Sequence, residues 1–395
     1  MIEVQDIFKQ HGENYMRTHK LPPHILKTII NIEDCRTAAL GGHVDECEDC
    51  GESRISYNSC RNRHCPKCQT LAKERWLDAR KNDLLPVPYF HIVFTIPKEL
   101  NYLTLLNQKA MYSILFKASS ETLLELAKDK KYLGSEIGFT MILHTWGQNL
   151  MNHPHIHCIV PSGGLSLNNN GWINSKKDFL MPVKVVSRKF RGKFLSYLKE
   201  EYKNNTDLVF TGETEELKRK DVFQCYIDKL YKTEWVVYCK PPFGSAEHVL
   251  EYLGRYTHRV AISNNRIIAL ENDYVVFKWR DYSDNNNEKF MTLCADEFIR
   301  RFLMHILPPK FVKIRHYGIL SNRNRITKLK KCKLLLKVSN VSEQSTISKL
   351  SIAELILKLT GKDIFACPIC KGKMLRKERL ESKLNRPPTK NMKVS

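Results

Sequence analysis

Short apolar and aromatic runs predict the strands of a sheet in the middle of the chain, at residues 89–97, 137–148, 155–164, 234–240 and 274–282. Amphipathic and helix-forming stretches lie between them, chiefly at residues 103–131, 185–202, 245–260 and 296–307. Strands and helices alternate irregularly, and there is no glycine-rich phosphate loop. We therefore expect an α+β fold with a central antiparallel sheet rather than a doubly wound one.

Composition divides the 395 residues into three regions, 1–80, 81–330 and 331–395. The first holds six of the thirteen cysteines and ends in a predicted helix over residues 69–85. The second carries most of the strand and helix patterns, and the third is rich in lysine. We expect three domains with these boundaries, of which the middle one is large enough to bury a core.

The chain is strongly basic, with a net charge of +22 and an isoelectric point near 9.4. Such an excess predicts binding to a polyanion, most commonly nucleic acid, although a solvated basic surface is the alternative. No apolar run is long enough to cross a bilayer, and the first twenty residues lack a secretory pattern. We expect a cytoplasmic chain without membrane contact, whose cysteines serve as metal ligands or core thiols.

The cysteines of the first region predict structural zinc. Two C-x-x-C pairs, Cys47/Cys50 and Cys65/Cys68, have the spacing of a small zinc-ribbon-like domain and together would complete one tetrahedral site. Four more potential ligands, interleaved with these pairs, could hold a second Zn²⁺, or could be buried thiols and DNA-contacting histidines: Cys35, His43, Cys60 and His64. The late Cys367/Cys370 pair is half a site, for which the sequence selects no partners.

A second group of residues predicts catalysis. His155 and His157 lie two apart on a predicted strand, so both imidazoles project from one face and could hold a divalent cation while Ile156 points into the core. Tyr252 and Tyr256 lie four apart on a predicted helix, so both hydroxyls leave one face. Tyrosine becomes a useful nucleophile only when its phenolate is stabilised, and a metal ion would polarise a phosphodiester beside it. The alternative, a packed aromatic pair, is disfavoured by the neighbouring Arg255 and Arg259.

Further basic residues predict contacts with DNA phosphates. Lys278 and Arg280 share one face of a predicted strand beside aromatic residues, a combination that suits single-stranded DNA. The other candidates flank the zinc ligands, the tyrosines or the late basic segment: Arg61, Arg63, Arg255, Arg259, Arg315 and Arg323.

The segments HPHIHCIVPSGG and YLGRYTHRVAISNNRI resemble the two-tyrosine transposases of bacterial insertion sequences, which are HUH endonucleases. CRTAALGGH, YNSCRNRHCPKCQ, FKWRDY, LPPKFVKIRHYGIL and CPIC resemble the same family, in the same order along nearly the whole chain. The resemblance implies an HUH fold with helical insertions, preceded by a zinc-binding DNA-recognition domain. It also implies that His155 and His157 are the metal pair and that Tyr252 and Tyr256 are the nucleophiles.

The same resemblance implies rolling-circle transposition through 5′-phosphotyrosine intermediates, with Mg²⁺ or Mn²⁺ in catalysis and one or two structural Zn²⁺. The partners would be single-stranded ends of the mobile element and target DNA. HUH enzymes usually have a third polar ligand, for which we expect Gln148, followed by His144 and His91. The alternatives are a replication initiator or relaxase, and a non-catalytic zinc-dependent DNA-binding regulator.

Overall fold

The computed structural model describes residues 2–176, 180–204, 207–243, 248–249, 252, 254, 260–281, 284–338 and 350–383. Its centre is a five-stranded sheet in the order β13-β5-β6-β3-β9, in which every neighbouring pair is antiparallel. These strands are β3 (Tyr89–Thr95), β5 (Gly138–Trp146), β6 (Asn152–Pro161), β9 (Val237–Phe243) and β13 (Ile314–Gly318). The expected α+β class with a central antiparallel sheet is confirmed.

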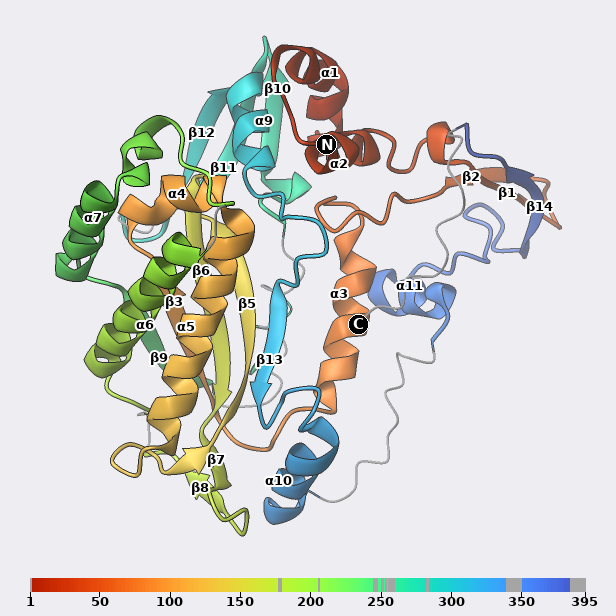
Figure 1. Ribbon diagram of the computed structural model, residues 1–395. Coiled ribbons are helices and arrows are strands. Elements are labelled where there is room, and N and C mark those ends of the chain that lie inside the picture. Colours follow the sequence, from red (N-terminus) through yellow and green to blue (C-terminus); the bar gives the residue numbers. More distant parts are fainter. Residues whose placement is uncertain are drawn as a thin grey trace.

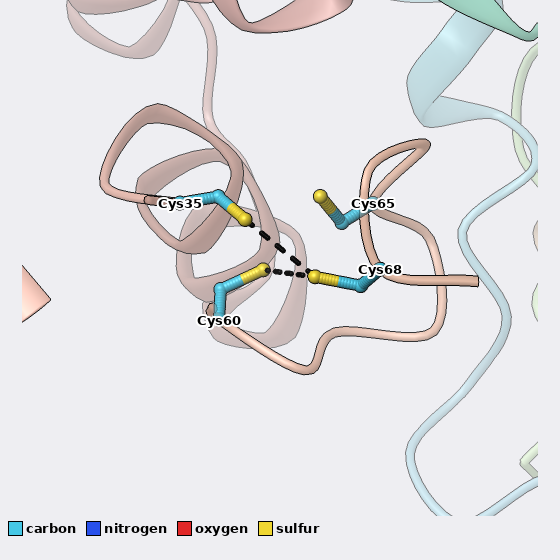
Figure 2. Close-up of side chains that lie close together, drawn as sticks. All are labelled: Cys35, Cys60, Cys65 and Cys68. Atoms are coloured by element: carbon cyan, nitrogen blue, oxygen red, sulfur yellow. Dashed lines mark hydrogen bonds between the residues drawn. The ribbon is translucent and has the colours of Figure 1, made fainter. Parts of the chain in front are cut away.

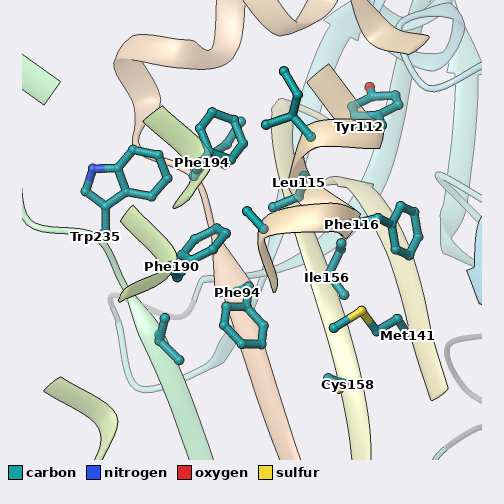
Figure 3. Close-up of a cluster of buried hydrophobic side chains, with 14 of the residues drawn as sticks. Phe94, Tyr112, Leu115, Phe116, Met141, Ile156, Cys158, Phe190, Phe194 and Trp235 are labelled. Carbon is teal, nitrogen blue, oxygen red and sulfur yellow. The ribbon is translucent and has the colours of Figure 1, made fainter. Parts of the chain in front are cut away.

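One face of this sheet is covered by helices and forms the main hydrophobic core (Figure 1). The helices are α4 (Asn101–Leu106), α5 (Gln108–Lys128), α6 (Val183–Asn204) and α7 (Lys220–Lys232). Alternate residues of each strand point into this core, among them Phe94 and Ile156. Figure 3 shows Phe94 against Phe190 of α6, with ring centroids 5.0 Å apart, and Trp235 beside Phe190. This packing fixes the sheet and thereby the residues on its opposite face.

The opposite face carries the polar residues and is approached by α3 (Gln69–Lys81). Trp76 and Leu77 of this helix pack in a cluster with Ile142, Ile159 and Tyr252. The helix ends four residues earlier than the sequence pattern predicts, and Asn82 is its C-cap. The first region of the chain therefore contacts the candidate catalytic face directly.

A second core joins the N-terminal helices to a separate antiparallel sheet. The elements are α1 (Val4–Thr18), α2 (Pro23–Glu33), β10 (Ile267–Glu271), β11 (Tyr274–Asp281), β12 (Asn287–Cys294) and α9 (Ala295–Leu303). Phe8 of α1 meets Phe302 of α9 edge-on, with centroids 5.4 Å apart. Helix α9 ends at Leu303, before the predicted end at residue 307. Residues 1–33 thus belong to the body of the protein rather than to an isolated front domain.

Strands from the first and the last regions of the chain pair in a third sheet, ordered β14-β1-β2 (Figure 1). It consists of β1 (Gly42–Cys47), β2 (Ser53–Tyr57) and β14 (Met374–Leu380). Further described elements are β4 (Ser135–Glu136), β7 (Gly163–Ser166), β8 (Trp172–Asn174), a π-helical turn (Arg325–Leu329), α10 (Lys330–Leu335) and α11 (Ile352–Thr360). Four described 3-10 helices are short: Ala38–Leu40, Lys98–Leu100, Gly212–Lys218 and Asn264–Arg266. Among the described helices, none combines the length and apolar character required to span a membrane.

Candidate active site and metal centres

Three histidines meet on the polar face of the central sheet. The ligand nitrogens of His144, His155 and His157 all lie within 4.8 Å of one another. His144 on β5 is directly opposite His155 on β6, and opposite residues of an antiparallel pair share a face. Ile156 is fully buried on the other face, as its place between the two histidines predicts. The sheet therefore brings three imidazoles within reach of one cation.

Hydrogen bonds orient the imidazoles of β6. Nδ1 of His155 donates to the carbonyl of His153 at 2.6 Å, which leaves Nε2 with its lone pair. That Nε2 lies 3.1 Å from Nε2 of His157. The separation suits two nitrogens at about 2.1 Å from one metal ion. Burial lowers the pKa of His155 to about 4, so its imidazole is neutral, the form that binds metal.

Tyr252 lies beside this cluster. Its hydroxyl is 2.6 Å from Nε2 of His91 and 3.3 Å from Nδ1 of His157. His91, on β3, also approaches His157, with 2.9 Å between Nε2 and Nδ1. Burial, and secondly the charge of Lys240, lower the pKa of His91 to about 3. A neutral imidazole can accept a hydrogen bond from the hydroxyl, so His91 links the tyrosine to the histidine cluster.

The sequence did not predict two features of this site: the identity of the third imidazole and the contact between His91 and Tyr252. Sequence reasoning ranked Gln148 first as the third ligand, but β5 ends at Trp146 and Gln148 lies in the following turn, where its carbonyl accepts a hydrogen bond from Arg266. His144, two residues before the end of β5, occupies the place beside His155 and His157 that was predicted for Gln148. The contact of His91 with Tyr252 was missed, because only the pairing of β3 with β6 brings His91 to this face. Tyr256, Arg255 and Arg259 lie outside the described residues.

The first cysteine cluster consists of Cys35, Cys60, Cys65 and Cys68 (Figure 2). Sγ of Cys68 is 3.5 Å from that of Cys35 and 3.6 Å from that of Cys60, and all four sulfurs lie within 4.8 Å of one another. A tetrahedral site with Zn–S bonds of about 2.3 Å requires sulfurs about 3.8 Å apart. Hydrogen bonds from Cys35, then Cys60 and Cys65, hold the pKa of Cys68 well below its usual range. The cluster fits a structural zinc ion.

The expected grouping of the cysteines is therefore wrong. Cys47 and Cys50 do not meet Cys65 and Cys68; they form a second cluster with Cys367 and Cys370. The reason is the hairpin of β1 and β2, whose return strand of five residues carries the chain about 17 Å from the first turn. Cys65 and Cys68 consequently meet Cys35, which follows α2.

His43 and His64, proposed above as ligands of a second zinc, are placed elsewhere. His43 lies on β1, with Nε2 3.3 Å from a carboxylate oxygen of Asp45 and 3.0 Å from the guanidinium of Arg376. His64 is buried, and its Nε2 accepts a hydrogen bond from the backbone N–H of Leu307. Burial, and then the charge of Arg63, lower its pKa well below the usual value. Neither imidazole belongs to a described metal cluster.

This arrangement predicts that Cys35 is a zinc ligand and that His43 is not. Cys35→Ser is expected to reduce the zinc content by one ion per chain and to lower the midpoint of thermal unfolding by about 5 °C or more. His43→Ala is the matched control, and it should leave the zinc content unchanged. Elemental analysis together with a thermal melt tests both, and equal zinc loss in the two variants would contradict the assignment.

The candidate DNA-binding cations separate into two groups. Arg61, Arg280 and Arg323 are exposed, and Lys278 is half-buried beside Glu288. Arg63 instead donates to the carbonyls of Phe311 and Pro308, at 2.5 and 2.9 Å, so it ties the first cysteine cluster to the body of the protein. Arg315 lies over the ring of Phe116, 4.1 Å from its centroid. These contacts occupy Arg63 and Arg315 within the fold.

Comparison with known proteins is consistent along the chain. A family described as "Putative transposase" matches residues 138–328, and one described as "Transposase zinc-binding domain" matches residues 7–96. The putative transposase y4qJ of Sinorhizobium fredii is 47% identical over 375 residues, 94% of each chain. The transposase for insertion sequence element IS801 of Pseudomonas savastanoi pv. phaseolicola is 25% identical over 353 residues, 89% of this chain and 82% of the relative. No solved structure matches the chain. The chain belongs to the IS91 family of insertion-sequence transposases, which carry an N-terminal zinc-binding domain.

Proposed function

We propose that this transposase is an HUH-type enzyme that nicks and joins single-stranded DNA through 5′-phosphotyrosine intermediates during rolling-circle transposition. The observation that carries the proposal is the position of the Tyr252 hydroxyl, 2.6 Å from His91 and 3.3 Å from His157. A nucleophile beside three convergent imidazoles suits metal-assisted phosphoryl transfer. An aromatic side chain that served only for packing would not require its hydroxyl at this place.

The three imidazoles fit a divalent ion, Mg²⁺ or Mn²⁺, which when bound would stabilise charge on the scissile phosphate and the leaving oxygen. His144, rather than Gln148, is the third ligand in this proposal. His91 is a positioning residue, because its neutral Nε2 accepts a hydrogen bond from the Tyr252 hydroxyl and turns that oxygen toward the cluster. The backbone carbonyl of His153 keeps the His155 ring in one orientation.

In the proposed reaction, the Tyr252 oxygen attacks phosphorus and the bond from phosphorus to the 3′ oxygen breaks. The 5′ phosphate becomes an ester of tyrosine, and the 3′ oxygen takes up a proton. One phosphate ester replaces another, so no nucleotide cofactor is needed. Tyr256 would supply a second nucleophile while Tyr252 is occupied, which allows cleavage and joining in one site. Residues 81–330 form the catalytic unit in this proposal, and residues 1–80 recognise DNA.

The test is formation of a covalent protein–DNA adduct. Incubated with Mn²⁺ and an oligonucleotide of a single-stranded element end, the protein should give a species that survives denaturing electrophoresis, and chelation before mixing should prevent it. Duplex DNA of the same sequence is the control and should yield far less. A replication initiator or relaxase would also form adducts but would not join element ends to a target strand. A regulator would bind the DNA and form no adduct.

The cations of β11 predict how binding depends on salt. Lys278 and Arg280 lie on one face of β11, with Phe290 across from Lys278. If both contact phosphates, K278A and R280A together should reduce the slope of log affinity against log salt by about 1.4, or about 0.7 for each contact. Arg219, exposed and paired with Asp221, is the matched control. Filter-binding titrations with single-stranded DNA measure the slope, and an unchanged slope would mean that this face is merely solvated.

A further inference from the structure

Two C-x-x-C turns from opposite ends of the chain face each other at one end of the sheet formed by β14, β1 and β2. Sγ of Cys47 is 3.4 Å from that of Cys370, and Sγ of Cys50 is 3.7 Å from that of Cys367. All four sulfurs lie within 4.8 Å of one another. A tetrahedral zinc site requires about 3.8 Å between sulfurs. The family match to a zinc-binding domain stops at residue 96, far before the second pair.

The two turns have the same backbone conformation. The N–H of Cys47 donates to the carbonyl of Glu52 at 2.9 Å, and the N–H of Cys367 donates to that of Gly372 at 2.8 Å. In each turn the residue after the second cysteine is left-handed, with φ +71° at Gly51 and +68° at Lys371. Equivalent hydrogen bonds at 3.1 Å return from these residues to the carbonyls of the first cysteines. Each turn therefore directs two sulfurs to one point, as two zinc knuckles do.

The turns also fit closely against each other. A Cβ on Gly372 would lie 2.0 Å from a carboxylate oxygen of Asp49, so the Asp49 side chain would have to move aside if residue 372 carried one. The N–H of Glu48 donates to the carbonyl of Lys373 at 3.0 Å. At the far end of the sheet, a Cβ on Gly41 would meet the carbonyl oxygen of Leu380 at 2.4 Å. Glycines at both ends of the contact between the first region and the C-terminal segment leave room for this close approach.

We propose that Cys47, Cys50, Cys367 and Cys370 bind one Zn²⁺, which completes a zinc ribbon assembled from the two ends of the chain. A ribbon was expected from the first region, but its second knuckle lies 317 residues further along. The metal makes the C-terminal segment a structural part of the zinc-binding domain. The proposal is independent of strand cleavage by Tyr252.

The C-terminal segment buries little apolar surface. Its described residues 350–383 bury few apolar side chains, chiefly Leu355, Cys367 and Met374, whereas Phe365 and Ile369 are 58% and 68% exposed. So small an apolar core does not keep a segment of this size folded without a disulfide or a metal. The sheet register between β1 and β14 adds backbone hydrogen bonds but also depends on the turns that set it.

The first experiment counts zinc in purified full-length variants by elemental analysis. C47S/C50S and C367S/C370S should each lose one ion per chain relative to the unaltered protein. All four substitutions together should also lose only one, because the pairs share one site. C225S/C294S, at two exposed cysteines outside both clusters, should lose none. A loss of two ions in the fourfold variant, or none in C367S/C370S, would overturn the proposal.

The central comparison of the second experiment, with and without chelator, keeps all cysteines and so does not depend on the folding of cysteine variants. A protease recognition sequence is inserted between residues 338 and 350, and the purified protein is cut there. The C-terminal fragment should co-elute with the remainder in size-exclusion chromatography, separate when a strong chelator is added, and separate without chelator in C367S/C370S. A fragment that stays attached after zinc has been removed would show that the metal does not hold the C-terminal segment to the rest of the protein.

Discussion

Replacing Tyr252 and Tyr256 together by phenylalanine is expected to abolish covalent adduct formation, with a fall on the order of 10³-fold or more, as when an enzymatic nucleophile is deleted. The substitution removes two hydroxyls and leaves both rings. At Tyr252 it loses the hydrogen bond to His91, which should cost only about 1 kcal/mol of folding stability. Chemistry and stability should therefore separate clearly.

The two single variants divide the roles of the tyrosines. Tyr252→Phe should prevent whichever step uses the hydroxyl beside His91, while Tyr256→Phe is expected to retain nicking and lose strand joining. Tyr274→Phe, at an exposed tyrosine on β11, is the matched control and should behave as the unaltered protein. Adduct yield on denaturing gels and joined product on sequencing gels are the measurements. Persistent adducts in the double variant would identify another nucleophile and refute the assignment.

Removal of the histidine cluster should have an effect of similar size. His155→Ala and His157→Ala are each expected to lower the rate of metal-dependent cleavage by about 10³-fold, equivalent to about 4 kcal/mol of transition-state stabilisation. Binding of single-stranded DNA should change little, because the metal acts on the transition state more than on the bound substrate. Single-turnover cleavage and filter binding, performed on the same variants, measure the two effects separately.

His153 supplies the matched control for this series. It lies on the same strand, two residues before His155, but is exposed and is not among the three convergent imidazoles. Its backbone carbonyl accepts the hydrogen bond from His155, and its ring lies 5.0 Å from the His155 ring between centroids. His153→Ala preserves that carbonyl and should retain cleavage within about twofold. His144→Ala should weaken Mn²⁺ binding by about 10- to 100-fold, and Gln148→Ala should not. The reverse order for these last two would restore the sequence-based choice of ligand.

The strands and the histidine face could be predicted because their signals are local. Alternation along a strand places His155 and His157 on one face and Ile156 in the core, whatever the rest of the chain does. The same reasoning placed Lys278 and Arg280 together on β11. The alternation of side chains along a strand and the residue types are sufficient to predict a shared face when the interacting residues are two positions apart.

The metal ligands could not be grouped in this way. Spacing identifies a C-x-x-C turn but not its partner, which depends on where the hairpin of β1 and β2 ends and on which strand pairs with its edge. The role of Arg63 was hidden for a similar reason, because its acceptors are carbonyls of residues 307–311. Contacts across more than two hundred residues are set by tertiary packing, which leaves no local pattern.

The pairing of β14 with β1 also sets the order in which the protein becomes complete during its synthesis. Cys50 leaves the ribosome 317 residues before Cys367, which at roughly 5–20 residues per second is an interval of about 15 s to a minute. Throughout that time the hairpin of β1 and β2 lacks its third strand and half of its sulfurs. The central sheet, from β3 to β13, is made within the interval. A chain cut short between β13 and β14 would therefore contain the histidine face but would lack the third strand and the second cysteine pair of the terminal sheet, so an intact terminal sheet requires translation through β14.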